Sequence, residues 1–168
     1  MKKLLTVQSL KKYFPLYGGL LSKLVGQVKA VDGVSFEINE GEILGLVGES
    51  GCGKTTVGRM TLRLMEPTSG NVYYKDSDIF SLNRKQLAKL RPQMQIIFQD
   101  PYSSLNPRFT VEQIIGEAIS IHYPINGKAL RAKVESLMEK VGLSQMYLNR
   151  DPHEFSGGQK QRIGIARA

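Results

Sequence analysis

The chain has 168 residues, of which 41% are hydrophobic and 23% are charged, a composition typical of a globular protein with its own core. No apolar run approaches the roughly 20 residues that a membrane-spanning helix needs, and Lys11 and Lys12 interrupt the apolar start too early for a signal peptide. The single cysteine, Cys52, excludes an internal disulfide. These features predict a cytoplasmic protein.

The net charge is +8, and its distribution is uneven. Residues 1–31 contain no acidic residue and six lysines: Lys2, Lys3, Lys11, Lys12, Lys23 and Lys29. Such a segment attracts a polyanion or an anionic lipid surface, or it forms a solvated basic face. Because no basic run is interleaved with aromatic residues and the chain has no Trp, we expect no nucleic-acid partner.

The first third of the chain predicts strands around a glycine-rich loop. Residues 4–10 read as a first strand, and residues 15–27, with three glycines, predict an exposed loop. Residues 28–38 alternate in part, as a half-buried antiparallel strand does. After a turn, the apolar run 43–47 predicts a strand buried on both faces of a parallel sheet.

Further elements follow in alternation. Residues 54–65 predict a helix, residues 71–75 a strand, and residues 82–90 a helix that stops before Pro92. The apolar run 94–98 is a second candidate for a buried strand.

The remainder is helical. Thr110 and Gln113 form a capping box ahead of an apolar helix. The next helix places apolar residues at 130, 134, 137 and 141 on one face, and Gly142 is its C-terminal cap. This order predicts an α/β core between a β lobe and a helical lobe.

One loop carries a phosphate-binding motif. It matches G-x-x-x-x-G-K-[ST] at every fixed position, and its residues are Gly48, Glu49, Ser50, Gly51, Cys52, Gly53, Lys54 and Thr55. A predicted strand precedes it and a predicted helix follows it, as this motif requires. Its glycines let backbone N–H groups converge on phosphate oxygens, and the helix N-terminus adds roughly half a positive charge.

The motif predicts ATP and Mg²⁺ as ligands. Lys54 would reach the β- and γ-phosphates, the Thr55 hydroxyl would bind Mg²⁺, and Thr56 would add a hydroxyl near the α-phosphate. Cys52 is either a small residue at a variable position, the interpretation we favour, or a thiol with a lowered pKa beside a helix N-terminus.

A second motif near the C-terminus identifies the type of ATPase. Ser156 and Gln159 form another capping box, and Gly157 and Gly158 leave the start of the following helix open to a phosphate. The stretch Phe155-Ser156-Gly157-Gly158-Gln159 resembles the LSGGQ signature of ABC ATPases, with Phe155 in the leucine position.

The resemblance covers nearly the whole chain and implies its fold. That fold is α/β, a P-loop NTPase (RecA-like) core with an N-terminal antiparallel β subdomain and a helical subdomain, here without the C-terminal part of the core. Residues 1–98 would form the β lobe and phosphate-loop core, and residues 99–160 the Q-loop and helical subdomain. Residues 156–168 would form the signature helix.

The resemblance also implies roles for single residues. Gln99 matches the Q-loop glutamine, which contacts Mg²⁺ and the attacking water. Tyr13 matches the A-loop aromatic residue that stacks on adenine. Phe14 is the competing choice, and either ring could instead belong to the core.

The amino-acid sequences of three stretches, 47–54, 98–108 and 152–159, are similar to those of the F-type ATP-binding subunit of oligopeptide and dipeptide importers. Nickel and glutathione importers use related subunits. The resemblance implies a head-to-tail pair with a second, different ATP-binding subunit, in which the signature contacts the partner's ATP. It also implies membrane-spanning permease subunits and a location at the cytoplasmic face of the membrane.

ABC ATPases also have an apolar strand ending in Asp-Glu, a D-loop and a switch histidine, and the 168 residues contain none of these. We therefore expect a fragment that binds ATP, hydrolyses it slowly, and exposes apolar surface on residues 43–47 and on the signature helix. Two alternatives are an ABC-type ATPase acting on nucleic acid or the ribosome, and a nucleotide-binding subunit without turnover.

Overall fold

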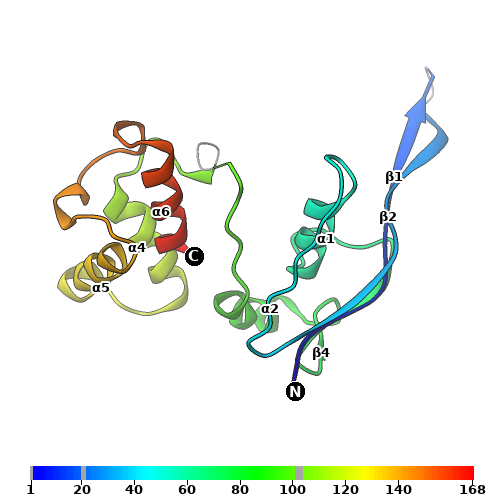
Figure 1. Cartoon of the computed structure of the whole chain (residues 1–168), viewed down its shortest axis with the longest axis horizontal. Coiled ribbons are helices and arrows are strands. Elements are labelled where there is room, and N and C mark those ends of the chain that lie inside the picture. Colours follow the sequence, from blue (N-terminus) through cyan, green and yellow to red (C-terminus); the bar gives the residue numbers. More distant parts are fainter. Residues whose placement is uncertain (1, 20–21, 101–103) are drawn as a thin grey trace. The chain divides into compact units, whose positions relative to one another are not determined.

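The computed structural model describes residues 2–19, 22–100 and 104–168. The chain forms two compact units, Met1–Leu90 and Arg91–Ala168, each with its own apolar core (Figure 1). Residues 20–21 of the predicted loop and residues 101–103 of the stretch 98–108 lie outside the described residues. The division into functional lobes near residue 98 stays a prediction.

The first unit is built on an antiparallel sheet. Its strands are β1 (Lys3–Gly18), β2 (Lys23–Asn39), β3 (Ser69–Tyr74) and β4 (Ser77–Asp78), in the order β2-β1-β3-β4. Each pair of neighbouring strands is antiparallel. The strands predicted at 4–10, 28–38 and 71–75 are confirmed as parts of β1, β2 and β3.

The prediction of an exposed loop at 15–27 is wrong, because the described parts of this segment continue β1 and β2 as paired strands. Pro15 pairs with Gln27, Leu16 with Gly26 and Gly18 with Lys23. Gly18 and Gly26 face side chains of the opposite strand: an added Cβ at Gly18 would come within 3.1 Å of the Val25 side chain. Cross-strand pairing supplies the hydrogen bonds that outweigh the low strand propensity of glycine.

Helix α1 (Lys54–Thr61) covers this sheet. It begins where the sequence predicts and ends four residues before the predicted end at residue 65. Val57 and Met60 on its inner face are buried in one cluster with five residues from elsewhere in the unit: Val7, Leu10, Val31, Val72 and Ile79. The cluster joins α1 to β1, β2 and β3 and so anchors the segment that precedes the helix.

The prediction of two buried parallel strands, at 43–47 and 94–98, is wrong. Neither run is a strand, and Ile43 and Val47 are 96% and 94% exposed. A parallel strand is stabilised by hydrogen bonds to neighbouring strands, and no described strand pairs with either run. The expected exposure of apolar surface on residues 43–47 is confirmed.

Helix α2 (Arg84–Leu90) ends the first unit and stops before Pro92, as predicted. Pro92 lies in the 3₁₀ turn η1 (Arg91–Gln93) that begins the second unit.

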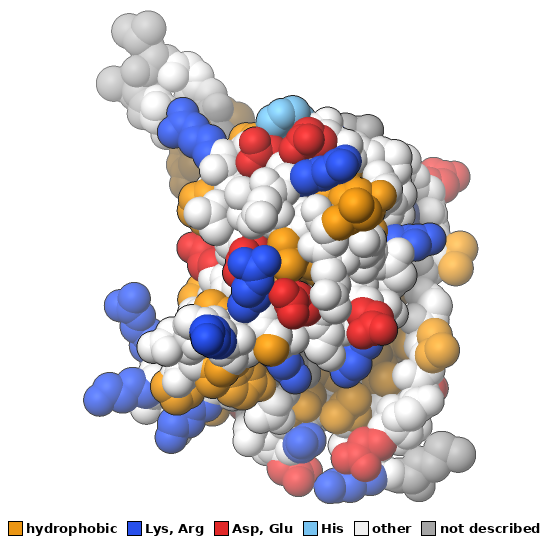
Figure 2. Space-filling model, turned by 90° about the vertical axis from the view of Figure 1, so that its left-hand side faces the viewer, with side chains coloured by type: hydrophobic (Ala, Val, Ile, Leu, Met, Phe, Trp, Pro, Cys, Tyr) orange, Lys and Arg blue, Asp and Glu red, His pale blue; other side chains and the backbone are white. Residues whose placement is uncertain are grey.

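The second unit is helical. Its helices are α4 (Val111–His122), α5 (Gly127–Lys140) and α6 (Gly157–Arg167), with the 3₁₀ turns η2 (Gln145–Tyr147) and η3 (Pro152–Glu154) between α5 and α6. Residues from all three helices share one core, including Ile115, Met138 and Ile163. The face drawn in Figure 2 mixes side chains of both charges with apolar ones.

Local signals in this unit behave as predicted. The Thr110 and Gln113 capping box is present at the start of α4. Gly142 follows α5 with φ 70°, and the N–H of Leu143 reaches back 2.9 Å to the carbonyl of Met138. In the described parts of the chain, no helix combines the length and apolar character that a membrane span requires.

Candidate phosphate-binding site

The loop before α1 has the backbone shape that its glycines predict. Gly51 and Gly53 have φ values of 81° and 95°, and Gly53 is the residue that caps α1. A Cβ at Gly53 would collide with the carbonyl oxygen of Ala30, and one at Gly48 would come within 2.6 Å of the Cys52 sulfur. The tight turn of the loop therefore favours glycine at positions 51 and 53.

Lys54 lies at the centre of this loop. Its Nζ donates hydrogen bonds to the carbonyl oxygens of Gly48 (2.7 Å) and Glu49 (2.6 Å) and lies 3.5 Å from the Cys52 sulfur. The ammonium group is therefore held inside the curve of the loop rather than extended into solvent. A cation in this position attracts an anion to the loop.

The start of α1 is open to such an anion. Gly53 provides no side chain to cap the helix, and its first turn contains no acidic residue. The first N–H groups of a helix lack partners within the helix and carry its positive dipole end. Thr55 is exposed and Thr56 is half-buried in this turn. The loop, the lysine and the helix start together fit the phosphates of a nucleotide.

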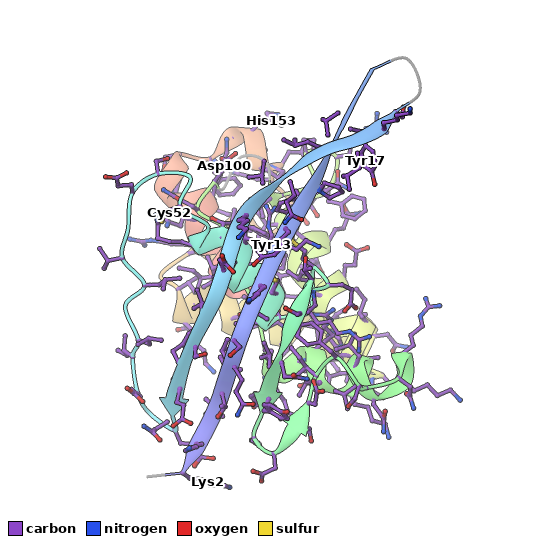
Figure 3. The ribbon with its side chains drawn as sticks, turned by 90° about the vertical axis from the view of Figure 1, so that its right-hand side faces the viewer. Lys2, Tyr13, Tyr17, Cys52, Asp100 and His153 are labelled. Atoms are coloured by element: carbon purple, nitrogen blue, oxygen red, sulfur yellow. The ribbon has the colours of Figure 1, made fainter. Side chains whose placement is uncertain are left out.

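Tyr13 lies partway along the β1–β2 hairpin, nearer the sheet than Tyr17 (Figure 3). Its hydroxyl donates a hydrogen bond to the Asp32 carboxylate, and the Lys29 ammonium lies 5.3 Å from the centre of its ring. Lys29 and Lys11 lie 3.5 and 3.7 Å from Asp32. The ring of Tyr13 is thereby held in one orientation by its partners on β2.

The same contacts shift two pKa values in opposite directions. The hydrogen bond from Tyr13, followed by the charges of Lys29 and Lys11, lowers the pKa of Asp32 below its ordinary value. The hydrogen bond to Asp32, with smaller effects of desolvation and charge, raises the pKa of Tyr13. Near neutral pH the pair is therefore a neutral phenol and a carboxylate.

Asp32 also lines a hollow beside the phosphate loop. The hollow has a volume of about 170 Å³, and its walls include Ala30, Val31, Gly53 and Lys54. Ligand pockets commonly measure about 300–1,000 Å³, so this unit encloses only part of a nucleotide-sized ligand. Asp32 thus connects the predicted adenine contact, Tyr13, to the wall of the phosphate site.

Sequence reasoning missed Asp32. The signal that identifies it is the hairpin register, in which Tyr13 pairs with Lys29 and Lys11 pairs with Asp32. Because residues 15–27 are predicted to be a loop, the sequence alone supplies no strand register that would place Asp32 beside Tyr13. Among the other loop residues, Glu49, Ser50 and Cys52 are exposed, and Cys52 is a free thiol.

The second predicted motif begins α6 in the other unit. The Ser156 hydroxyl accepts from the N–H of Gln159 (3.3 Å), and the Gln159 side chain accepts from the N–H of Ser156 (3.0 Å), which confirms the capping box. Gly157 and Gly158 form the first helical residues, and a Cβ at Gly158 would meet nothing within 4 Å. Phe155 is buried and packs edge-on against Tyr147 at 5.6 Å.

Gln99 lies exposed in an irregular segment of this second unit. The predicted site residues thus form two separate groups: Gly48 to Thr56 lie together in the first unit, and Ser156 to Gln159 lie together in the second. The functional roles of Tyr13, Gln99 and both motifs stay predictions.

Comparison with known proteins gives consistent matches. A family model described as "ABC transporter" matches residues 31–168. The oligopeptide transport ATP-binding protein AppF of Bacillus subtilis is 51% identical over 98% of this chain and 50% of its own length. The dipeptide transport ATP-binding protein DppF of Haemophilus influenzae is 49% identical over 98% of this chain and 50% of its own.

Another relative, the glutathione import ATP-binding protein GsiA of Escherichia coli, is 48% identical over 98% of this chain and 26% of its own. Among solved structures, a dimeric post-hydrolysis state of the ATP-binding cassette MJ0796, bound to ADP and Pi, superposes with a TM-score of 0.82. That match has 27% identity and covers 98% of this chain and 68% of the cassette. The chain spans about half the length of the peptide-transport relatives it matches.

Proposed function

The chain belongs to the ABC transporter family, as its two motifs predicted, and from that membership we propose that it is an ATP-binding subunit of a peptide importer. The fold predicted from sequence is likewise supported by its similarity to an ATP-binding cassette. The observation that carries the nucleotide assignment is the Lys54 ammonium, held within a glycine loop at an open helix start.

In this proposal the loop binds the phosphates of ATP. Lys54 exchanges its hydrogen bonds to the Gly48 and Glu49 carbonyls for phosphate oxygens, which carry full negative charge and are stronger acceptors. The N–H groups at the start of α1 donate to the same phosphates. Thr55 would hold Mg²⁺, which neutralises phosphate charge when it is bound. The family resemblance gives Gln99 a role toward the same ion.

Tyr13 would contact the adenine ring. Its hydrogen bond to Asp32 fixes the ring plane before the nucleotide arrives, so less rotamer freedom is lost on binding. Asp32 therefore acts as a positioning residue, because it works through Tyr13 rather than on the phosphates.

The signature residues Ser156, Gly157, Gly158 and Gln159 would act on a partner's nucleotide. The MJ0796 cassette is described as a dimer, and the same arrangement here would pair the phosphate loop of one subunit with the signature of another. Membrane-spanning permease subunits would complete the importer, with this subunit at the cytoplasmic face of the membrane. Oligopeptides or dipeptides are the proposed cargo, and glutathione is the related alternative.

The proposed hydrolysis is slow for these 168 residues alone. They contain no apolar strand ending in Asp-Glu to position the attacking water. ATP binding and ATP turnover are therefore separate expectations: both depend on the loop around Lys54, and turnover depends in addition on a positioned general base.

Titration of the chain with a fluorescent ATP analogue tests the assignment. Lys54→Met should lower the affinity at least tenfold because it removes the central cation. Lys85→Met is the matched control, since Lys85 is exposed on α2 and outside the loop. Equal affinity of Lys54→Met and the unchanged chain would contradict nucleotide binding at this loop.

A further inference from the structure

The outer part of the β1–β2 hairpin differs from the rest of the sheet. β3 pairs with β1 only as far as Lys11, whereas β1 and β2 stay paired out to Gly18 and Lys23. Beyond Lys11 the sheet is therefore a two-stranded ribbon, which extends away from α1 in Figure 1. Both faces of such a ribbon are open to a partner.

Apolar side chains cover this ribbon on both strands. Tyr17, Leu24 and Val25 are 65%, 66% and 68% exposed, and Leu16 and Val28 are close to half exposed. Tyr17 and Leu24 form a cross-strand pair, while Leu16 lies opposite Gly26. None of these five side chains belongs to the core of the unit or packs against it. The packing of the unit's core therefore does not explain why these five positions are apolar.

The charge on this ribbon is only positive. Lys12, Lys23 and Lys29 lie on it, and residues 1–31 contain no acid. The nearest carboxylate along β2 is Asp32, which is already bound by Tyr13, Lys11 and Lys29. Within the described residues Lys23 has no ion-pair partner.

We propose that this ribbon docks on an anionic lipid bilayer. Tyr17, Leu24 and Val25 enter the headgroup region, and Lys23 lies among the lipid phosphates. A tyrosine ring is suited to that interface because one end is apolar and the other is polar. Lysine can keep its stem against apolar groups while its ammonium contacts phosphate.

A bilayer fits this surface better than a protein partner does. Leu24 and Val25 are successive strand residues and lie on opposite faces of the ribbon, and a lipid surface can contact both faces at once. Insertion stops at the headgroups, because the unpaired N–H and C=O groups at the strand edges would lose their hydrogen bonds to water in the hydrocarbon core. The inference adds a lipid contact to the proposed importer subunit and does not depend on the nucleotide site.

Tryptophan reporters test the proposal directly, because the chain has no Trp. In Tyr17→Trp the only tryptophan lies on the ribbon, and excitation selective for tryptophan reports on it alone. Its emission should shift to the blue with phosphatidylglycerol vesicles, and lipids that carry a spin label on the headgroup should quench it. Tyr123→Trp is the matched control, since Tyr123 is also an exposed tyrosine but lies in the helical unit. Its emission should not change.

Vesicle sedimentation measures the contributions of charge and apolar contact. One lysine near an anionic surface contributes about fivefold in binding, so Lys23→Gln should weaken sedimentation by about that factor. Leu24→Ser combined with Val25→Ser should weaken it about tenfold or more. Met146→Ser, at an exposed apolar residue of the other unit, should have no effect.

Three results would overturn the proposal. The first is no blue shift of Tyr17→Trp with anionic vesicles, as expected if the ribbon instead binds an acidic protein. The second is an equal shift with neutral phosphatidylcholine vesicles, which would remove the role of the lysines. The third is vesicle binding that quenches Tyr123→Trp as strongly as Tyr17→Trp, which would indicate nonspecific adsorption through other exposed apolar surface.

Discussion

Asp32 and Tyr13 illustrate how single residues connect the two halves of the proposed nucleotide site. Nineteen positions separate them, and the hairpin register brings the phenol to the carboxylate. Asp32 in turn lines the hollow beside Gly53 and Lys54. In the proposed site, Asp32 would influence how the base is bound by positioning Tyr13.

Substitutions of this pair should change binding of the base but not of the phosphates. We expect Asp32→Asn and Tyr13→Phe each to weaken ATP binding about two- to tenfold, the range for loss of one hydrogen bond. Tripolyphosphate has no base, so its affinity should be unchanged, as calorimetry can measure. The double variant should bind ATP no more weakly than either single one. Additive losses, or an equal loss for tripolyphosphate, would rule out the positioning role.

The pH dependence of stability follows from the same pair. Because the pKa of Asp32 is lowered in the folded state, its contribution is present above the ordinary aspartate pKa and is lost as pH falls through the lowered value. Because the pKa of Tyr13 is raised, its contribution is present below the ordinary tyrosine pKa and is lost as pH rises through the raised value.

Urea unfolding across pH measures this effect. The stability difference between the chain and Asp32→Asn should be largest near neutral pH and should vanish in acid. Absorbance titration of tyrosinate provides the second measurement, since Asp32→Asn should lower the pKa of Tyr13. A pH-independent difference between the two proteins would contradict the assignment.

At the scale of elements, the exposed run 43–47 contrasts with the buried face of α1. Val47 is 94% exposed and Val57 is 4% exposed. The two valines are ten positions apart, on either side of the phosphate loop. They offer a matched comparison of one substitution in two environments.

We expect Val57→Ser to destabilise the first unit by about 2–4 kcal/mol, because it leaves a cavity and buries a hydroxyl in the core. Val47→Ser should leave the free energy of unfolding nearly unchanged and should reduce self-association, because it removes exposed apolar surface. Chemical denaturation and light scattering at several concentrations measure the two effects. Equal destabilisation by both variants would mean that residues 43–47 are buried in solution.

The start of α6 combines a structural cap with a proposed phosphate contact, and two substitutions of Ser156 separate these roles. Ser156→Ala should cost about 1 kcal/mol of stability because it removes the cap. Ser156→Asp should keep the cap, since aspartate is also a good N-cap residue, but should repel a partner's nucleotide. Thermal unfolding measures the first effect, and ATP-dependent pairing with a full-length relative measures the second. Unchanged pairing of Ser156→Asp would contradict the proposed contact.

At the scale of the whole molecule, the phosphate loop and the signature belong to different compact units. The chain also spans about half of its peptide-transport relatives. In the proposed function, the loop that binds the phosphates of ATP lies in the first unit, whereas turnover would depend on a strand ending in Asp-Glu, which the 168 residues do not contain. Binding and hydrolysis should therefore differ widely in this chain.

We expect ATP turnover by the chain to be about 10²–10⁴ times slower than that of a full-length relative such as AppF, because a positioned general base contributes about that factor. Phosphate release under saturating ATP measures it. Lys54→Met supplies the background rate from contaminating ATPases. A rate for the unchanged chain equal to that of the relative would refute the expectation.

The sequence by itself determined the features that are formed by neighbouring residues. The glycine loop around Lys54 and the capping boxes at Thr110 and Ser156 all lie where the sequence predicts them. Each is completed within a few positions of the chain, by backbone angles that glycine allows or by a side chain bonded to its own helix. The family resemblance follows from these same local motifs.

Only the tertiary structure decided which segments pair. The sequence did not predict the strand pairing in the described parts of 15–27 or the Tyr13–Asp32 contact. It also predicted strands at 43–47 and 94–98 that are not formed. The physical reason is that a strand exists through hydrogen bonds to a partner strand, and that partner can lie far along the chain. An apolar run without a partner stays exposed, and a glycine-rich run with a partner becomes a ribbon.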